Sequence, residues 1–134
     1  MTTRTRDRLM YGGLAVATIA IGLLVHLRGT ALNADVRDVL GDALWAGMML
    51  WLVSAVAPAA ARAARGGVAL AICFTVELSQ LIHSPAIDAL RATLFGRLVL
   101  GSGFDARDLA AYAVGVAAAL VVERVAWAAF FDSR

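Results

Sequence analysis

Long apolar stretches separated by short polar segments make up most of the chain. Residues 9–27 carry no formal charge, and a helix needs about 20 apolar residues to cross a bilayer. The segments between the stretches contain Pro, Gly and Asp, which end or cap helices. This pattern predicts an all-α integral membrane fold with four transmembrane helices, over residues 9–27, 36–57, 68–84 and 105–130.

The segment from residue 86 to 100 differs from these stretches because it is too polar to cross a membrane. Ile87, Leu90, Leu94 and Leu98 recur every three or four positions, which is the spacing of one helix face. An amphipathic helix of this kind lies in the plane of the membrane interface. We therefore expect a short interfacial helix between the third and fourth transmembrane helices.

The composition strengthens the membrane assignment. Hydrophobic residues make up 61% of the chain, whereas a soluble domain has about 45–50%. One small helical bundle accounts for the whole length, so we expect a single domain over residues 1–134 that ends in a short polar tail at residues 132–134.

The charged residues indicate which membrane holds the protein and how the protein is oriented in it. All twelve basic residues are arginines, and with the many alanines they suggest a GC-rich bacterial genome and therefore the bacterial cytoplasmic (inner) membrane. The arginines are dispersed, without the basic patch that nucleic acid binding requires. Arg4, Arg6 and Arg8 precede the first helix, and arginine-rich flanks stay in the cytoplasm, which predicts a multi-pass protein with both termini cytoplasmic. The same start resembles a signal peptide, but the apolar stretch is long for one and further spans follow.

Glu77 is the most informative single residue because it lies within an otherwise apolar run, Val68 to Ile82. A charged side chain at the centre of a membrane helix costs about 2.5–3.5 kcal/mol on insertion scales. Glu77 is therefore expected to face a partner, a proton, water or a ligand rather than lipid.

The predicted topology brings other polar residues to the depth of Glu77. The second helix enters from the outer side, so Asp42 lies about 9 Å below its start at 1.5 Å per residue. Gln80 lies one turn beyond Glu77, and Asp108 falls in the first turns of the fourth helix. The interfacial segment supplies arginines at the same level. The candidate ligand-binding residues are Asp42, Trp45, Glu77, Gln80, Arg91, Arg97, Asp108 and Tyr112.

Two interpretations of this group have about equal weight. The acids could pair with Arg91, Arg97 or Arg107 and only hold the bundle together, since buried charges need partners whatever their purpose. Trp45 and Tyr112 are more often interface anchors than ligands. A site, by contrast, could hold a hard cation, share protons between carboxylates, or grip an anionic group through the arginines.

No motif in the sequence indicates an enzyme. The chain has no His pair of the metalloprotease type, no phosphate-binding loop, no nucleophile elbow and no Cys–His zinc spacing. We therefore predict no catalytic residue, no metal site and no cofactor. The single cysteine, Cys73, is expected to be a small buried residue.

Five sequence blocks together resemble a small bacterial membrane family known only as domain of unknown function 2809, which is related to VanZ-like proteins. The blocks are Gly41-Asp42-Ala43-Leu44-Trp45-Ala46, Glu77-Leu78-Ser79-Gln80-Leu81, Leu90-Arg91-Ala92-Thr93, Gly96-Arg97-Leu98-Val99-Leu100-Gly101 and the run from Phe104 through Asp108-Leu109 to Tyr112-Ala113-Val114-Gly115. The resemblance implies four membrane helices and no established activity.

The leading functional hypothesis is a multi-pass inner-membrane protein whose outward-facing polar pocket binds an anionic lipid headgroup or an envelope precursor such as a lipid-linked phosphate. Arg91 and Arg97 would contact the anion, and the acids with Gln80 would orient them. The alternatives are a small ion- or proton-coupled transporter, expected to be a homo-oligomer, and a structural or assembly subunit. A membrane-embedded enzyme acting on a lipid-linked phosphate has no motif in its favour. Nucleic acid is not an expected partner.

Overall fold

The computed structural model describes residues 2–101 and 103–131, and every regular element among them is helical. The polar tail expected at residues 132–134 lies outside the described residues. The elements are α1 (Thr3–Arg28), a short 3-10 helix η1 (Gly29–Ala31), α2 (Ala34–Val56), α3 (Arg62–Ser79), α4 (Pro85–Ala92), α5 (Leu94–Leu100) and α6 (Ala106–Phe131). The all-helical prediction is therefore confirmed.

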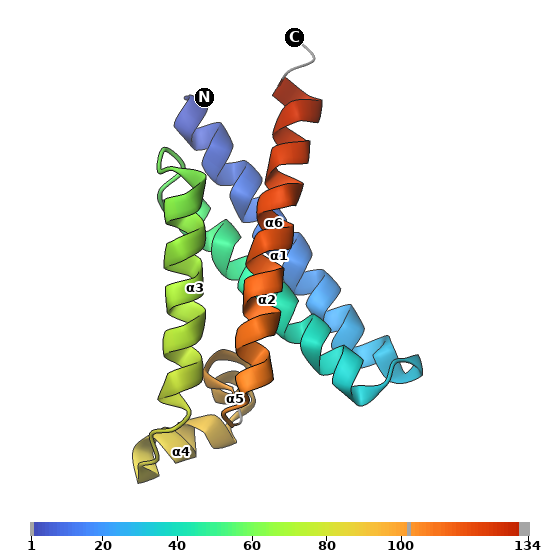
Figure 1. Cartoon of the computed structure of the whole chain (residues 1–134), viewed down its shortest axis with the longest axis vertical. Coiled ribbons are helices and arrows are strands. Elements are labelled where there is room, and N and C mark those ends of the chain that lie inside the picture. Colours follow the sequence, from blue (N-terminus) through green and yellow to red (C-terminus); the bar gives the residue numbers. More distant parts are fainter. Residues whose placement is uncertain (1, 102, 132–134) are drawn as a thin grey trace.

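The four long helices alternate in direction (Figure 1). The start of α1, the turn between α2 and α3 and the end of α6 lie at one end of the molecule, and η1, α4 and α5 lie at the other. The hairpin of α1 and α2 crosses α6, so its connecting turn diverges from α4 and α5. This divergence opens the region in which the predicted polar residues lie.

Small residues let the helices approach one another closely at the crossing of α2 and α6. The buried core contains Tyr11, Ala15, Ala46, Leu50, Trp51, Ala69, Cys73, Tyr112, Val116 and Ala119. At Gly115 a side chain would collide with the backbone carbonyl of Ala43, so only glycine permits this contact. Close packing of this type drives association between membrane helices, where the hydrophobic effect gives little.

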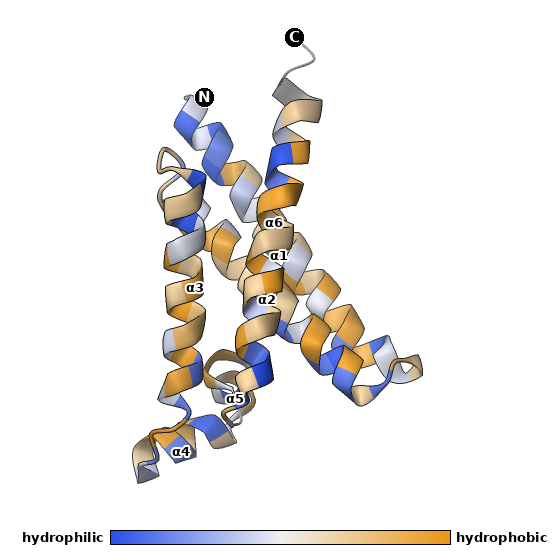
Figure 2. Cartoon of the chain, in the orientation of Figure 1, coloured by the Kyte–Doolittle hydropathy of each residue, from blue (hydrophilic) through white to orange (hydrophobic). Residues whose placement is uncertain are grey.

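Three helices among the described residues are long and apolar enough to cross a membrane, at Thr3–Ala31, Ala34–Val56 and Ala106–Ala129. Much of their surface consists of exposed Leu, Ile and Val side chains. Figure 2 shows the hydrophobic colouring along the middle of the long helices, with hydrophilic residues at their ends and around α4. These surfaces indicate a membrane protein.

The observed ends of the first and third helices differ from the predicted ones. The first helix begins at Thr3 rather than residue 9, because the Thr2 hydroxyl accepts a hydrogen bond from the Thr5 amide and caps it. The third helix covers Arg62–Ser79 rather than 68–84. It includes Arg62 and Arg65, which the apolar pattern excludes but which pair with another helix.

The segment expected to form one interfacial helix consists of two short helices. Ser84 caps α4 by accepting a hydrogen bond from the Ile87 amide, and Pro85 stands at its first position. Thr93 ends α4 and caps α5 through the Gly96 amide. A threonine that can serve both helices therefore breaks the segment in two.

Candidate functional site

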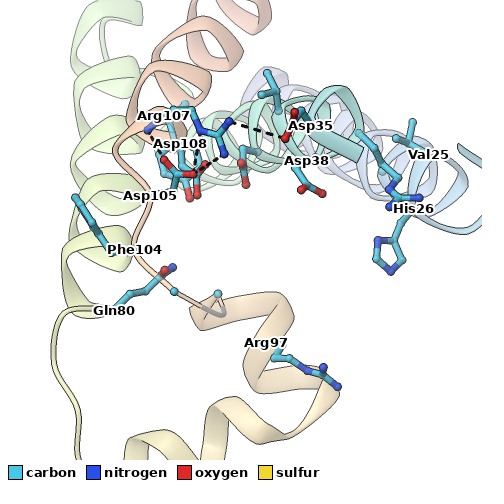
Figure 3. A pocket seen from close by; sticks show the side chains of 18 of the residues that line it. Val25, His26, Asp35, Asp38, Gln80, Arg97, Phe104, Asp105, Arg107 and Asp108 are labelled. Atoms are coloured by element: carbon cyan, nitrogen blue, oxygen red, sulfur yellow. Dashed lines mark hydrogen bonds and ion pairs between the residues drawn. The ribbon is translucent and has the colours of Figure 1, made fainter. Parts of the chain in front are cut away.

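A polar cavity of about 780 Å³ lies at the end of the bundle where α1 and α2 diverge from α5 and α6. Residues of α1 and α2 line one side: Gly22, Val25, His26, Asp35, Arg37, Asp38, Val39, Gly41 and Asp42. The residue after α3, the helices α5 and α6 and the loop between them supply the rest: Gln80, Leu94, Arg97, Gly101, Gly103, Phe104, Asp105, Arg107, Asp108 and Tyr112. Figure 3 shows Gln80 and Arg97 across the cavity from Asp38 and His26.

A second cavity of about 360 Å³ adjoins the first and is mostly apolar. Thr18, Ile19, Leu23, Leu44, Trp45, Met48, Val76 and Val99 complete its walls. The residues common to both cavities are Gly22, His26, Gly41, Asp42, Gln80, Arg97, Gly101 and Tyr112. We call the two cavities together the cleft. It has a charged compartment and an apolar compartment, with polar residues at the boundary.

Glu77 lies behind the cleft rather than on its surface. Its side chain is 0% exposed. One carboxylate oxygen accepts a hydrogen bond of 2.8 Å from the Asp105 amide, and the other accepts one of 2.8 Å from the Tyr112 hydroxyl. The carboxylate therefore joins α3 to the start of α6 and orients Tyr112, which lines the cleft.

Asp42 and Asp108 face each other across α2 and α6, and their carboxyl groups are within hydrogen-bonding contact. Two carboxyl groups make such a contact only when they share a proton. Both are half-buried. Among the described residues, no ion pair joins Asp42, Glu77 or Asp108 to Arg91, Arg97 or Arg107.

Gln80 lies at the boundary of the two compartments. Its side chain is only 5% exposed, and within the described part of the chain its Oε1 atom has no hydrogen-bond partner. Gly101 has a φ of 72°, and a side chain there would collide with the Gln80 amide. The backbone after α5 therefore makes room for an amide group that has an unused acceptor.

Arg91 and Arg97 have different roles. Arg91 is buried and donates to the backbone carbonyls of Ser79 and Ile82, at 2.7 and 2.9 Å. It thus satisfies carbonyl groups at the end of α3 and ties α4 to it. Arg97 lines both compartments and is exposed. In the part of the chain described, its guanidinium has no carboxylate partner.

The outer rim of the cleft is held by Arg107. Its guanidinium donates to Asp105 at 2.9 Å and lies 3.9 Å from Asp35 of α2. The hydrogen bonds from the Arg107 side chain and backbone amide hold the pKa of the partly exposed Asp105 carboxyl below its usual range. The described residues offer no group of three or more His, Cys, Asp or Glu side chains arranged to hold a metal ion.

Of the eight predicted residues, six line the cleft: Asp42, Trp45, Gln80, Arg97, Asp108 and Tyr112. Glu77 supports it from behind, and Arg91 lies below it in a smaller cavity that Gln80 and Arg97 also line. His26 is not among the predicted residues, yet it lines both compartments.

A second polar cluster, buried except for Arg62, lies at the opposite end of the bundle and was not predicted from the sequence. We call it the Arg65–Glu123 cluster; it comprises Tyr11, Ser54, Arg62, Arg65 and Glu123. Arg65 donates to Glu123 at 2.7 Å, to Ser54 at 2.6 Å and to Tyr11 at 3.1 Å. Glu123 is a carboxylate in an apolar helix, so the reasoning applied to Glu77 would have found it.

The family model described as "Protein of unknown function (DUF2809)" matches residues 31–116. This region contains all eight predicted residues. Tyr11 and Glu123 of the second cluster lie outside it. No solved structure matches the chain.

Proposed function

This chain belongs to the DUF2809 family of proteins of unknown function, and we propose that it is a multi-pass membrane protein whose cleft binds an amphiphile whose head group carries an anionic phosphate. The observation that carries the proposal is that a charged cavity adjoins an apolar one. An amphiphile divides into the same two parts. Its head group would lie in the charged compartment and its chain in the apolar compartment beside Trp45 and Met48.

Arg97 is the proposed contact for the anion. It borders both compartments, and among the described residues no carboxylate pairs with its guanidinium. A guanidinium donates two parallel hydrogen bonds to a phosphate, which suits a lipid head group or a lipid-linked phosphate. Arg91, by contrast, is occupied by backbone carbonyls and would act by holding the end of α3 in place.

We propose that four helices cross the membrane in a single domain. They are the three helices that are long and apolar enough to do so, together with α3. Its 18 residues extend about 27 Å at 1.5 Å per residue, close to the ~30 Å hydrocarbon core. Its buried charges have partners that offset their burial, since Arg65 pairs with Glu123 and Glu77 accepts two hydrogen bonds. The helices α4 and α5 would then lie at the membrane interface.

The location and the wider relationship are also proposals. The arginine-rich start of α1 favours cytoplasmic termini, so the cleft would open on the outer side of a bacterial cytoplasmic membrane. The relation to VanZ-like proteins rests on the five sequence blocks alone.

Native mass spectrometry of the purified protein tests lipid binding. Arg97→Gln should lose copurifying phospholipid, whereas Arg28→Gln, at an exposed position outside the cleft, should retain it. Gly22→Leu should also lose lipid, because a side chain at this position meets no atom within 4 Å and extends into the cleft. Gly13→Leu is the matched control on the same helix, since it too meets nothing within 4 Å but lies outside the cleft. Equal lipid retention in all four variants would disprove the proposal.

The Asp42–Asp108 pair favours proton-coupled transport as a second candidate. A proton held between two carboxyl groups at a cavity wall can be exchanged when a ligand enters. Four helices enclose little volume, so a transporter would work as a homo-oligomer. Asp108→Asn should then abolish proton flux in proteoliposomes. Flux equal to that of the unchanged protein would contradict this candidate.

A further inference from the structure

The charges around the cleft are mixed, which bears on the chemistry of the head group. Among the described residues, five aspartates and three arginines line the charged compartment. Arg107 is occupied by Asp105 and Asp35. A head group with negative charge alone would meet Arg97 but would also approach Asp38 and the Asp42–Asp108 pair.

The acceptors gather on one side of the cleft. Gln80 presents a 95% buried amide whose Oε1 atom has no partner in the described part of the chain. Asp42 and Asp108 present carboxyl oxygens from the helices that border it. A buried acceptor without a donor is unfavourable, so these groups favour a ligand that brings several N–H donors. A primary ammonium group carries three N–H donors.

Resting on the proposed function, we infer that the head group is a zwitterion: a phosphate that binds Arg97 and a primary ammonium that donates to Gln80, Asp42 and Asp108. Phosphoethanolamine has this chemistry, with its two charges joined by a short ethylene bridge. The adjoining apolar compartment would hold the acyl chain, so the ligand is a phosphatidylethanolamine-like lipid. The ammonium would also replace the proton between the two carboxyl groups, since a cation stabilises both in the charged form.

Three lipids of equal chain length separate the contributions in a native mass spectrometry titration. Phosphatidylethanolamine carries the ammonium donors, phosphatidylcholine carries the same charges without any N–H, and phosphatidylglycerol carries the phosphate without the cation. Phosphatidylethanolamine should bind about tenfold or more tightly than phosphatidylcholine, the ratio expected for one charge-assisted hydrogen bond. Phosphatidylglycerol should also bind more weakly than phosphatidylethanolamine.

Variants assign the preference to residues. Gln80→Met keeps the size of the side chain and removes the acceptor, so binding of phosphatidylethanolamine should fall toward that of phosphatidylcholine. Asp42→Asn should act in the same way at a second position, which guards against misfolding of the first variant. Arg97→Gln should weaken all three lipids. Gly13→Leu, outside the cleft, should change none of them.

The outcomes distinguish this inference from the function on which it rests. Equal binding of phosphatidylethanolamine and phosphatidylcholine, or a preference for phosphatidylglycerol, would overturn the inference and leave amphiphile binding intact. Failure of all three lipids to bind would overturn both. Displacement of the lipid by free phosphoethanolamine at a similar concentration would support head-group recognition and indicate a soluble source. Lack of displacement would support recognition of the head group on a lipid.

Discussion

The two ends of the bundle each hold a fully buried glutamate, and the two glutamates have different kinds of partner. At one end, Glu123 accepts hydrogen bonds from Tyr11, Arg62 and Arg65 through a single carboxylate oxygen. At the other end, Glu77 accepts from a tyrosine hydroxyl and a backbone amide.

The surroundings of the two glutamates also differ. The Arg65–Glu123 cluster joins α1, α2, α3 and α6, and Arg65 further lies over the Tyr11 ring at 5.3 Å. Glu77 adjoins a cleft in which aspartates outnumber arginines among the described residues. The comparison teaches that a buried carboxylate alone does not indicate a site. A buried carboxylate that pairs with an arginine from a neighbouring helix has a structural role. Acceptors without hydrogen-bond donors beside a cavity indicate a candidate site.

The largest effect is expected from Arg65→Met. Removing one partner of a buried ion pair costs about 3–5 kcal/mol because the other charge stays buried. The thermal midpoint in detergent, followed by tryptophan fluorescence, should fall sharply, while the fraction that remains folded should retain lipid. The double variant Arg65→Met with Glu123→Leu should recover much of the loss, because no unpaired charge remains. A double variant as unstable as the single one would contradict the interpretation of this cluster as an ion-pair lock.

A smaller loss of stability is expected from Gly115→Val, which tests the helix crossing between the two regions. A side chain there meets the Ala43 backbone, and overpacking of this kind costs about 1–3 kcal/mol. Gly41→Val is the matched control in α2, because nothing lies within 4 Å of a side chain at Gly41. Equal thermal midpoints for the two variants would show that the crossing tolerates separation of α2 and α6.

The sequence predicted much of this arrangement because charge within an apolar helix is a local signal. Six of the eight candidate residues line the cleft, since the alternating directions of the helices bring Asp42, Gln80 and Asp108 to one end. The Arg65–Glu123 cluster was not predicted because the predicted helices, over residues 36–57 and 68–84, leave Arg62 and Arg65 between them. Only the packing of α3 against α6 reveals that Arg65 is buried.

The roles of the two arginines in α4 and α5 could not be separated from sequence either. Arg91 and Arg97 occur at similar depth in a similar context, yet one caps the end of α3 and the other borders the cleft. The difference depends on the break at Thr93, which rotates α5 relative to α4. A break of this kind is set by one hydroxyl group, and the hydrophobic spacing gives no sign of it.

Glu77→Gln should have a moderate effect on stability, about 1 kcal/mol, because the amide keeps one acceptor for the Tyr112 hydroxyl or the Asp105 amide. Lipid retention should persist, since the Glu77 side chain does not border the cleft. Thermal unfolding and native mass spectrometry on the same sample measure both. Loss of lipid with an unchanged thermal midpoint would place Glu77 in the binding site itself.

The smallest change in stability is expected from Asp108→Asn, less than about 0.5 kcal/mol. An asparagine amide donates directly to Asp42, so the contact no longer requires a shared proton. Glu123→Gln makes the same carboxyl-to-amide exchange at the other end, and there it places an amide beside Arg65, which needs a charged acceptor. The two substitutions form a matched pair in a thermal unfolding experiment. Asp108→Asn could instead destabilise the protein as much as Glu123→Gln. The aspartates of the cleft would then have the same structural role as the Arg65–Glu123 cluster, and the distinction between the two ends would be wrong.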